Sequence, residues 1–259
     1  MNNLAILICS CDKYEDAWQP FFFFFKKFWG NCDIPIYLLT NFKKYNDDKI
    51  ISLCIGEDID WSTTFLHAIE KINKKYLLIF MEDYFLTEKV DFDFIKKSVI
   101  YMQENKISYF RLFPCPGPDN IIGNIDDIKI GEIMKNSPYR VSLQLAIWDI
   151  DYLKRLVKKG ESAWEFEIRG TERTNNMDDR LISISRETRY PLKYLCTAIV
   201  KGYWKKEAVE LCKKNGIKLD LKKRKIEPFY VRKDIKIIIK LVNLKNKIKK
   251  RLKKIFSKK

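Results

Sequence analysis

Six consecutive apolar residues, Tyr76–Met81 (Tyr-Leu-Leu-Ile-Phe-Met), end abruptly at Glu82 and Asp83. An uninterrupted apolar run of this length is typical of a strand buried on both faces of a parallel sheet. The run Leu4–Ser10 has the same character near the start of the chain. Because such strands need helices on each side, the two runs predict an α/β fold with a Rossmann-like, mixed and mostly parallel sheet flanked by helices.

The segments around these strands alternate between helix-like and strand-like patterns. Glu15–Trp29 is expected to be a helix, although its five consecutive phenylalanines also fit a strand. Trp61–Lys74 is expected to be a helix capped by Ser62. Residues 114–124 are expected to form a functional flap, and residues 168–193 a polar loop. Further strands are predicted at Ile34–Leu39, Ile50–Ile55, Ser108–Phe113, Ser142–Trp148 and Tyr194–Val200, and further helices at Asp91–Asn105, Tyr152–Lys159 and Lys205–Asn215.

Positive charge is concentrated at the C-terminal end of the chain. The 259 residues include 50 Lys and Arg against 34 Asp and Glu, but residues 218–259 hold 18 of the basic residues and only three of the acidic ones. The remainder is close to neutral, so the basicity belongs to one segment and indicates a local anionic partner. We therefore predict a domain over residues 1–217 and a basic extension over residues 218–259.

Several classes of site are excluded by what the chain lacks. It has one histidine, His67, so HExxH zinc sites and His-rich metal centres are ruled out. Its nine glycines form neither a GxGxxG nor a GxxxxGK[ST] pattern, which argues against a dinucleotide loop and a P-loop. Seven cysteines without a CxxC pair, no signal-peptide pattern and no apolar run near ~18 residues predict a cytoplasmic protein with reduced thiols.

Two acidic segments are candidates for chemistry. Glu82 and Asp83 follow a buried strand, at the sheet edge where α/β proteins bind ligands, and would suit a divalent cation bridging a diphosphate. The alternative is a helix cap and a solvated acid. Glu165 and Glu167 lie in Trp-Glu-Phe-Glu, where neighbouring aromatics would raise a carboxyl pKa toward that of a general base. Here the alternative is a short helix anchored by its aromatics, with both glutamates in solvent.

The order of these segments resembles a glycosyltransferase of the GT-A type. The resemblance covers roughly residues 4–217, and the same segments are similar to a group of bacterial proteins associated with surface-polysaccharide synthesis. The pair Glu82-Asp83 stands where that class carries a DxD motif, although it lacks the first Asp of a true DxD. The segments that carry the resemblance are Cys9–Tyr14, Tyr37–Asn41, Trp61-Ser62, Glu82–Phe85 and Trp164–Glu167.

The resemblance implies a hexosyltransferase-like enzyme that moves a sugar from a nucleotide-sugar donor to a glycan or lipid-linked acceptor in capsule or lipopolysaccharide biosynthesis. Glu165 or Glu167 would be the catalytic base, and Trp164 would contact the acceptor. Glu82 and Asp83 would hold Mg²⁺ or Mn²⁺. The implied nucleotide-sugar-binding residues are Cys11, Asp12, Tyr14, Thr40, Asn41, Trp61, Ser62, Glu82 and Asp83.

The end of the chain has the pattern of an amphipathic helix. From Ile237 to Ile255, apolar residues recur at intervals of three and four, with lysines and Arg251 around them. A basic amphipathic helix over residues 233–259 favours docking at the anionic inner face of the cell membrane. A helix packed on the body is the alternative. Nucleic acid is a weaker fit, because the tail has few aromatic residues for stacking on bases.

Two other functional classes remain open at this stage. One is a nucleic-acid-binding or scaffold protein that uses the basic tail. The other is a nucleotidyltransferase, which would share the α/β unit and the acidic pair. The second would normally show a glycine-rich phosphate loop early in the chain, and the stretch after Leu4–Ser10 has none.

Overall fold

The computed structural model describes residues 2–229. They fall into two compact units, the first ending at Cys196 and the second beginning at Thr197. The predicted basic helix over residues 233–259 lies outside the described residues. The domain boundary predicted after residue 217 stays a prediction. Within the described part of the chain, no helix is long and apolar enough to cross a membrane.

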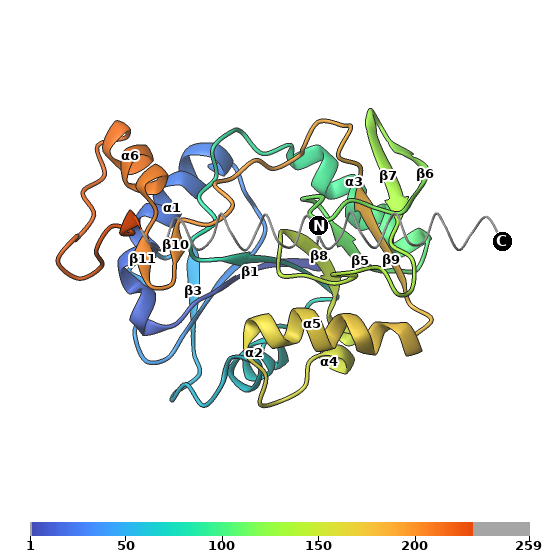
Figure 1. Cartoon of the computed structure of the whole chain (residues 1–259), viewed down its shortest axis with the longest axis horizontal. Helices are drawn as coiled ribbons and strands as arrows, with labels where there is room; N and C mark the ends of the chain where they lie inside the picture. Colours follow the sequence, from blue (N-terminus) through green and yellow to red (C-terminus); the bar gives the residue numbers. More distant parts are fainter. Residues whose placement is uncertain (1, 230–259) are drawn as a thin grey trace. The chain divides into compact units, whose positions relative to one another are not determined.

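The first unit is built on a nine-stranded mixed sheet (Figure 1). The strand order is β3-β2-β1-β4-β8-β5-β9-β7-β6. In this sheet β8 runs antiparallel to both of its neighbours, as does β7, while the remaining strands share one direction. The predicted mixed, mostly parallel sheet is therefore confirmed. The strands are β1 (Leu4–Cys9), β2 (Ile36–Thr40), β3 (Ile50–Cys54), β4 (Tyr76–Met81), β5 (Ile107–Arg111), β6 (Asn120–Ile125), β7 (Ile128–Glu132), β8 (Ala146–Asp149) and β9 (Arg180–Ile184).

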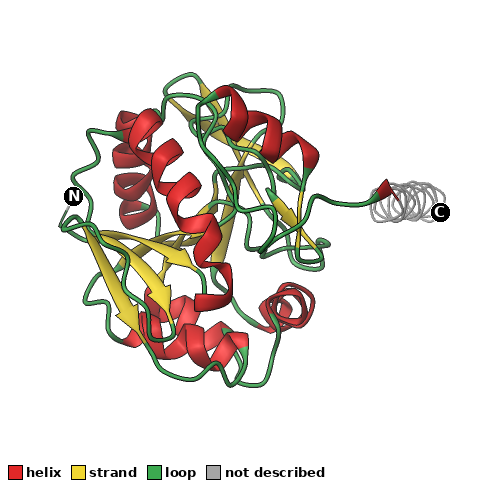
Figure 2. Ribbon diagram, turned by 90° about the vertical axis from the view of Figure 1, so that its left-hand side faces the viewer, coloured by secondary structure: helices red, strands yellow, loops and turns green. Residues whose placement is uncertain are grey.

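Helices cover both faces of this sheet (Figure 2). In Figure 1, α2, α4 and α5 lie on one side, and α1 and α3 lie on the other. This arrangement explains the uninterrupted apolar strands, because successive side chains of a strand point to opposite faces and both faces are buried. The helices are α1 (Glu15–Trp29), α2 (Trp61–Glu70), α3 (Phe92–Glu104), α4 (Ile150–Leu156) and α5 (Ala163–Arg173).

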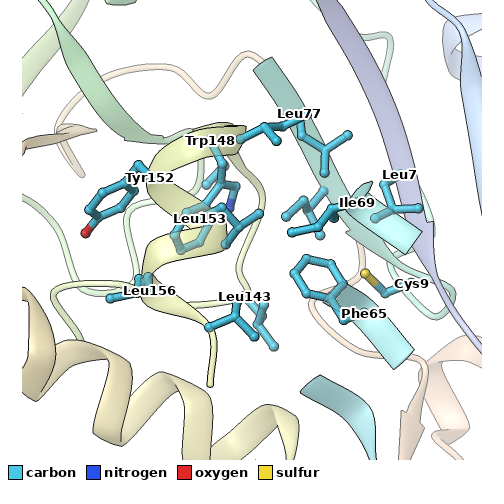
Figure 3. Close-up of a cluster of buried hydrophobic side chains, with 14 of the residues drawn as sticks. Leu7, Cys9, Phe65, Ile69, Leu77, Leu143, Trp148, Tyr152, Leu153 and Leu156 are labelled. Carbon is cyan, nitrogen blue, oxygen red and sulfur yellow. The ribbon is translucent and has the colours of Figure 1, made fainter. Parts of the chain in front are cut away.

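The core between the sheet and the α2, α4 and α5 layer is drawn in Figure 3. Leu7 and Cys9 of β1 point into it, together with Leu77 of β4. Phe65 of α2 is fully buried there, and its ring stacks on Trp61 with centroids 4.9 Å apart. This packing holds the amino-terminal end of α2 close to the carboxyl ends of β1 and β4.

The phenylalanine run forms the middle of α1, so the helix prediction is confirmed and the strand alternative is wrong. Phe21 meets Phe80 of β4 edge to face at 5.9 Å, and Phe24 stacks on Phe85 at 5.5 Å. Phe23 is 39% exposed, which marks the outer face of the helix. A helix accommodates the run because the other four phenylalanines of the run are buried against the body of the unit.

Three local predictions are wrong. Residues 168–193 are not one loop, because α5 continues to Arg173 and β9 inserts its short buried stretch, Leu181–Ile184, beside β5. The expected flap is partly β6, which forms a hairpin with β7. Asp60, rather than Ser62, caps α2, and its carboxylate accepts from the Thr63 N–H at 2.8 Å.

Other boundaries differ from the prediction by a few residues. The strand expected from Ser142 begins only at Ala146, and residues 139–145 are irregular. The strand expected over Tyr194–Val200 is reduced to a bridge between Tyr194 and Leu86 and, in the second unit, to two residues. That second unit contains β10 (Ile199–Val200), β11 (Tyr203–Trp204) and α6 (Lys206–Lys214), the last of which confirms the predicted helix.

Candidate functional site

The sheet topology gathers the predicted site segments at one edge. Cys9 pairs with Met81, so the residues after β1 and after β4 leave the sheet side by side. Ala146 pairs with Ile79, which places the irregular segment before β8 at the same edge. Ligands of α/β proteins bind outside the carboxyl ends of the parallel strands. This edge is therefore the candidate site.

Asp12 and Asn41 form a brace across this edge. The Asp12 carboxylate accepts backbone N–H groups from Asn41 at 3.0 Å, Phe42 at 3.1 Å and Lys43 at 3.2 Å. In return, Asn41 Oδ1 accepts the Asp12 N–H at 2.9 Å, and Asn41 Nδ2 donates to the Gly56 carbonyl at 3.0 Å. Gly56 has a φ of +93°, which favours glycine. The two side chains thus join the loops that follow β1, β2 and β3.

The other predicted nucleotide-binding residues differ in how much surface they offer. Thr40 and Ser62 are both 0% exposed, so neither reaches a ligand at this edge. Thr40 Oγ1 donates to Cys54 Sγ at 3.5 Å, and Ser62 Oγ donates to Asp60 at 2.7 Å. Their assignment to ligand contact is corrected: Thr40 packs inside the fold, and Ser62 supports Asp60, the residue that caps α2. Cys11, Tyr14 and Trp61 are half-buried and keep some exposed surface.

The acidic pair lies in the turn directly after β4. Glu82 is 7% exposed and Asp83 is 8% exposed. Burial raises the pKa of the Cys11 thiol, and the negative charges of Glu82 and Asp58 raise it further, which places these carboxylates near Cys11. Asp58 was not predicted as a site residue. Glu82 and Asp83 are therefore enclosed by the fold, whereas Asp58 is exposed.

Among residues 2–229, no three His, Cys, Asp or Glu side chains come together as a metal-binding group. A cation carried by a diphosphate needs only one or two protein carboxylates, because phosphate oxygens and waters complete its coordination. Glu82 and Asp83 fit that requirement by donor type. They do not fit a metal held by protein ligands alone.

The two glutamates of α5 have opposite environments. Glu165 completes a capping box with Ser162, accepting from its N–H at 3.0 Å and from its hydroxyl at 2.9 Å. These hydrogen bonds, together with the charge of Arg169, lower the pKa of Glu165. Glu167 is mostly enclosed, and burial raises its pKa, opposed by the Leu143 N–H, which donates to Oε1 at 2.7 Å, and by the charge of Arg111. Of the two, only Glu167 has the environment of a general base.

The two aromatic residues of the same helix, Trp164 and Phe166, also differ in their exposure to solvent. Phe166 is fully buried, 5.5 Å from the Trp61 ring and 6.2 Å from the Trp148 ring. Trp164 is 66% exposed at the start of the helix. Phe166 therefore anchors α5 to the core, whereas the indole of Trp164 remains open to a ligand.

Tyr84 is the point at which the separate segments meet. Burial raises its pKa well above the ordinary value, and the charges of Asp83, Cys196, Glu167 and Glu82 act in the same direction. A carboxylate of α5 and the acidic pair after β4 thus lie within electrostatic range of one phenol. Along the chain, Glu167 and the nearer acid, Asp83, are 84 residues apart.

A hydrogen-bonded cluster surrounds Tyr84. Its hydroxyl donates to the Leu143 carbonyl at 3.4 Å and accepts from Gln144 Nε2 at 3.4 Å. The Tyr194 hydroxyl donates to Gln144 Oε1, and the two tyrosine rings are 4.8 Å apart. Sequence reasoning missed Gln144 and Tyr194. The available signal was that Gln144 is a lone polar residue inside the apolar run Leu143–Trp148.

The amino-terminal ends of α2 and α5 are joined beside this edge. Asp60 accepts the Gly160 N–H at 3.1 Å, and Ser62 N–H donates to the Glu161 carbonyl at 3.1 Å. Glu161 is 4% exposed and pairs through both oxygens with Arg173, each contact being 2.7 Å. This junction fixes the start of the helix that carries Glu167.

No family model matches the chain, and no curated protein matches its sequence. Among solved structures, S. aureus TarS 1–349 is similar with a TM-score of 0.48 and 11% identity, over 76% of this chain and 60% of that one. This chain thus spans less than two thirds of the TarS fragment. TarS has also been solved with UDP, at 11% identity over 73% of this chain and 59% of that one, with a TM-score of 0.48.

A cytidylyltransferase from Leptospira borgpetersenii is similar as well. Its TM-score is 0.47 at 14% identity, over 83% of this chain and 96% of that one.

Proposed function

We propose that this protein is a glycosyltransferase of the GT-A type, which moves a sugar from a nucleotide-sugar donor to an acceptor hydroxyl, with Glu167 as the base. The observation that carries the proposal is that Leu143 links Glu167 of α5 to Tyr84, the residue directly after Glu82 and Asp83, at the carboxyl edge of the sheet. During transfer the acceptor hydroxyl must approach the anomeric carbon to which the donor diphosphate is attached, so the base and the diphosphate-binding residues must line one site. Acids on two separate elements at one edge satisfy that requirement.

Glu167 suits the removal of a proton from the acceptor. Its Oε1 is held by the Leu143 N–H, and Oε2 has no hydrogen-bond partner among residues 2–229, so it can receive the proton. Because burial raises the pKa of Glu167, the carboxylate is a stronger base than an exposed one. As the proton moves to Oε2, the acceptor oxygen attacks the anomeric carbon and the nucleoside diphosphate leaves.

The diphosphate would lie toward Glu82 and Asp83. If Mg²⁺ or Mn²⁺ accompanies the donor, these residues would hold it, and the cation would offset the charge of the leaving group. The half-buried Cys11 and Tyr14, which follow β1, are the proposed contacts to the nucleoside. Asp12 and Asn41 shape this part of the site through their brace.

The exposed indole of Trp164 is the proposed acceptor platform. It precedes Glu167 by three residues on α5, so the two lie on neighbouring positions of the helix surface. Sugar rings stack their apolar face on aromatic side chains. We further propose a glycan or lipid-linked acceptor of a bacterial surface polysaccharide, with residues 233–259 docking the enzyme on an anionic membrane surface.

The rival function of nucleotidyl transfer is less well supported by the first loop. β1 passes through Ser10 and Cys11 into a single 3-10 turn, Asp12–Tyr14, without glycine. A glycine-rich loop would let backbone N–H groups approach a nucleotide triphosphate closely. In this loop, the N–H of Asp12 is already bonded to Asn41.

The test combines binding with turnover. Thermal stabilisation by UDP, GDP, CMP and dTDP identifies the nucleotide, with and without Mn²⁺, and an Asp83→Asn variant tests the acidic pair. Sugar transfer from the matching donor is then compared for Glu167→Gln and for Glu165→Gln. The second is a matched control on the same helix, because Gln preserves a capping box.

We expect Glu167→Gln to lower transfer by about 10²- to 10⁴-fold while leaving nucleotide stabilisation intact. Glu165→Gln should transfer sugar at close to the parent rate. Full activity of Glu167→Gln would contradict the assigned base. Stabilisation by CTP with release of pyrophosphate, in place of sugar transfer, would favour the nucleotidyltransferase.

A further inference from the structure

Arg111 is a buried cation that the proposed reaction does not use directly. It ends β5 and is 0% exposed. It has no salt bridge within residues 2–229, since its partners are the Tyr109 hydroxyl and three backbone carbonyls. A buried charge is costly unless its hydrogen-bonding groups are satisfied. An arginine at this buried position therefore points to a role that needs the planar set of N–H donors of its guanidinium group.

That task is to hold an irregular segment, residues 139–144, which we name the strap. Arg111 Nη2 donates to the Tyr139 carbonyl and, at 3.1 Å, to the Arg140 carbonyl. Arg111 Nη1 donates to the Pro116 carbonyl at 2.7 Å. One guanidinium thus ties the strap to the loop that follows β5.

The rest of the strap is held in the same manner, by side chains. Thr171 of α5 bonds both the N–H and the carbonyl of Val141, each at 3.3 Å. The Tyr109 hydroxyl donates to the Ser142 carbonyl at 3.2 Å while accepting from Arg111 Nε at 3.0 Å. Arg111, Tyr109 and Thr171 therefore form one connected set of clamps.

The strap ends at the proposed base. Leu143 N–H donates to Glu167 Oε1 at 2.7 Å, and the Leu143 carbonyl accepts from Tyr84. The Ser142 carbonyl and the Leu143 N–H belong to one planar peptide unit, so the hydrogen bond from Tyr109 to that carbonyl helps to determine where the N–H points. Arg111 holds the Tyr109 hydroxyl in place and fixes the preceding part of the strap. A shift of the strap would turn the Glu167 carboxylate away from the acceptor.

We infer that Arg111 is a positioning residue, which acts through the strap to aim the Leu143 N–H at Glu167 and so orients the base. The inference rests on the proposed function of Glu167. Arg111 does not touch the substrates, because it has no exposed surface. Its effect should therefore appear in the rate of the chemical step and not in donor binding.

The experiment compares single-clamp variants of the full chain. Arg111→Lys keeps the positive charge but loses the several N–H donors of the guanidinium group. Thr171→Val removes the hydroxyl that bonds Val141 without changing the side-chain shape. Tyr109→Phe removes the hydrogen bond to the Ser142 carbonyl. Tyr152→Phe is the matched control, because the buried Tyr152 hydroxyl has no hydrogen-bond partner among the described residues. Each variant is measured for kcat, for donor KM and for hydrogen exchange of the Leu143 amide.

We expect a fall in kcat of about 10- to 100-fold for Arg111→Lys, with a smaller fall for Thr171→Val and Tyr109→Phe, because a misplacement near 1 Å can cost ~10²-fold. Donor KM should change less than about twofold, and the Leu143 amide should exchange faster in all three. Tyr152→Phe should match the parent in each measurement. If Arg111→Lys does not fold, the two milder variants decide the question.

The outcomes separate this inference from the proposed function. Parent-like kcat and Leu143 exchange in the folded clamp variants, beside an inactive Glu167→Gln, would overturn the role of Arg111 alone. Full activity of Glu167→Gln would overturn the proposed base, and with it the inference. Equal losses in kcat and in donor affinity would show a general structural defect, and would also overturn the positioning role.

Discussion

Replacing Asp12 by Ala should destabilise the first unit, because this residue braces three loops at the candidate site. The substitution removes every acceptor that serves the N–H groups of Asn41, Phe42 and Lys43. Hydrogen bonds to a charged group contribute ~1.5–3 kcal/mol each when water is excluded. Phe42 and Lys43 are exposed, however, so water can replace the carboxylate at two of the three donors.

The expected loss is therefore close to the value of one enclosed bond, about 2 kcal/mol. For a unit of this size, such a change lowers the unfolding midpoint by roughly 4–8 °C. Urea denaturation followed by tryptophan fluorescence measures it, with an unchanged m-value indicating the same unfolded surface. Asp48→Ala is the control, since it makes the same change at an exposed aspartate six residues beyond Phe42.

Coupling with Asn41 provides a second check. Asn41→Ala removes the acceptor of the Asp12 N–H and the donor to Gly56, so the two side chains brace the same loops. The double variant should lose less stability than the sum of the single losses, by about 0.5 kcal/mol or more. An Asp12→Ala protein that matches Asp48→Ala within about 0.5 kcal/mol would refute the brace.

Three further predictions test the site and the tail. Burial raises the pKa of Glu167 above 4.5, so the protonated side chain stabilises the folded state at low pH, and this stabilisation is lost as pH rises through the folded-state pKa. Glu167→Gln should therefore be no less stable than the parent at pH 7 in urea denaturation. Phe65→Ala should cost about 3–5 kcal/mol of unfolding free energy by calorimetry, since the ring is fully buried against Trp61, and a loss below about 1 kcal/mol would contradict that packing. Deleting residues 233–259 should abolish sedimentation with anionic liposomes while the melting midpoint stays unchanged, and retained liposome binding would remove the membrane proposal.

The sequence alone was enough for elements whose signal is local. The runs Leu4–Ser10 and Tyr76–Met81 predicted β1, which ends one residue earlier at Cys9, and β4, because strands buried on both faces must be apolar at nearly every position. The bounds of α1 were predicted correctly despite the phenylalanine run. The acids after β4 could be placed at a carboxyl edge for the same reason. The short β9 was missed because five buried residues between Arg180 and Arg186 carry too little periodic signal.

Only the tertiary structure decided which of the candidate residues have the right surroundings. Glu165 and Glu167 are indistinguishable in Trp-Glu-Phe-Glu, but the helix turns one toward Ser162 and solvent and the other toward Leu143. Asp12 and Arg111 are ordinary polar residues in the sequence, and their partners lie about 30 residues away along the chain. A side chain's pKa, exposure and hydrogen bonds depend on neighbours that the fold supplies from distant segments. The sequence by itself therefore determined the layers of this protein and the edge that holds its acids. The surroundings of the proposed base, and the strap that we propose orients it, arise only when β5, the segment before β8 and α5 pack together.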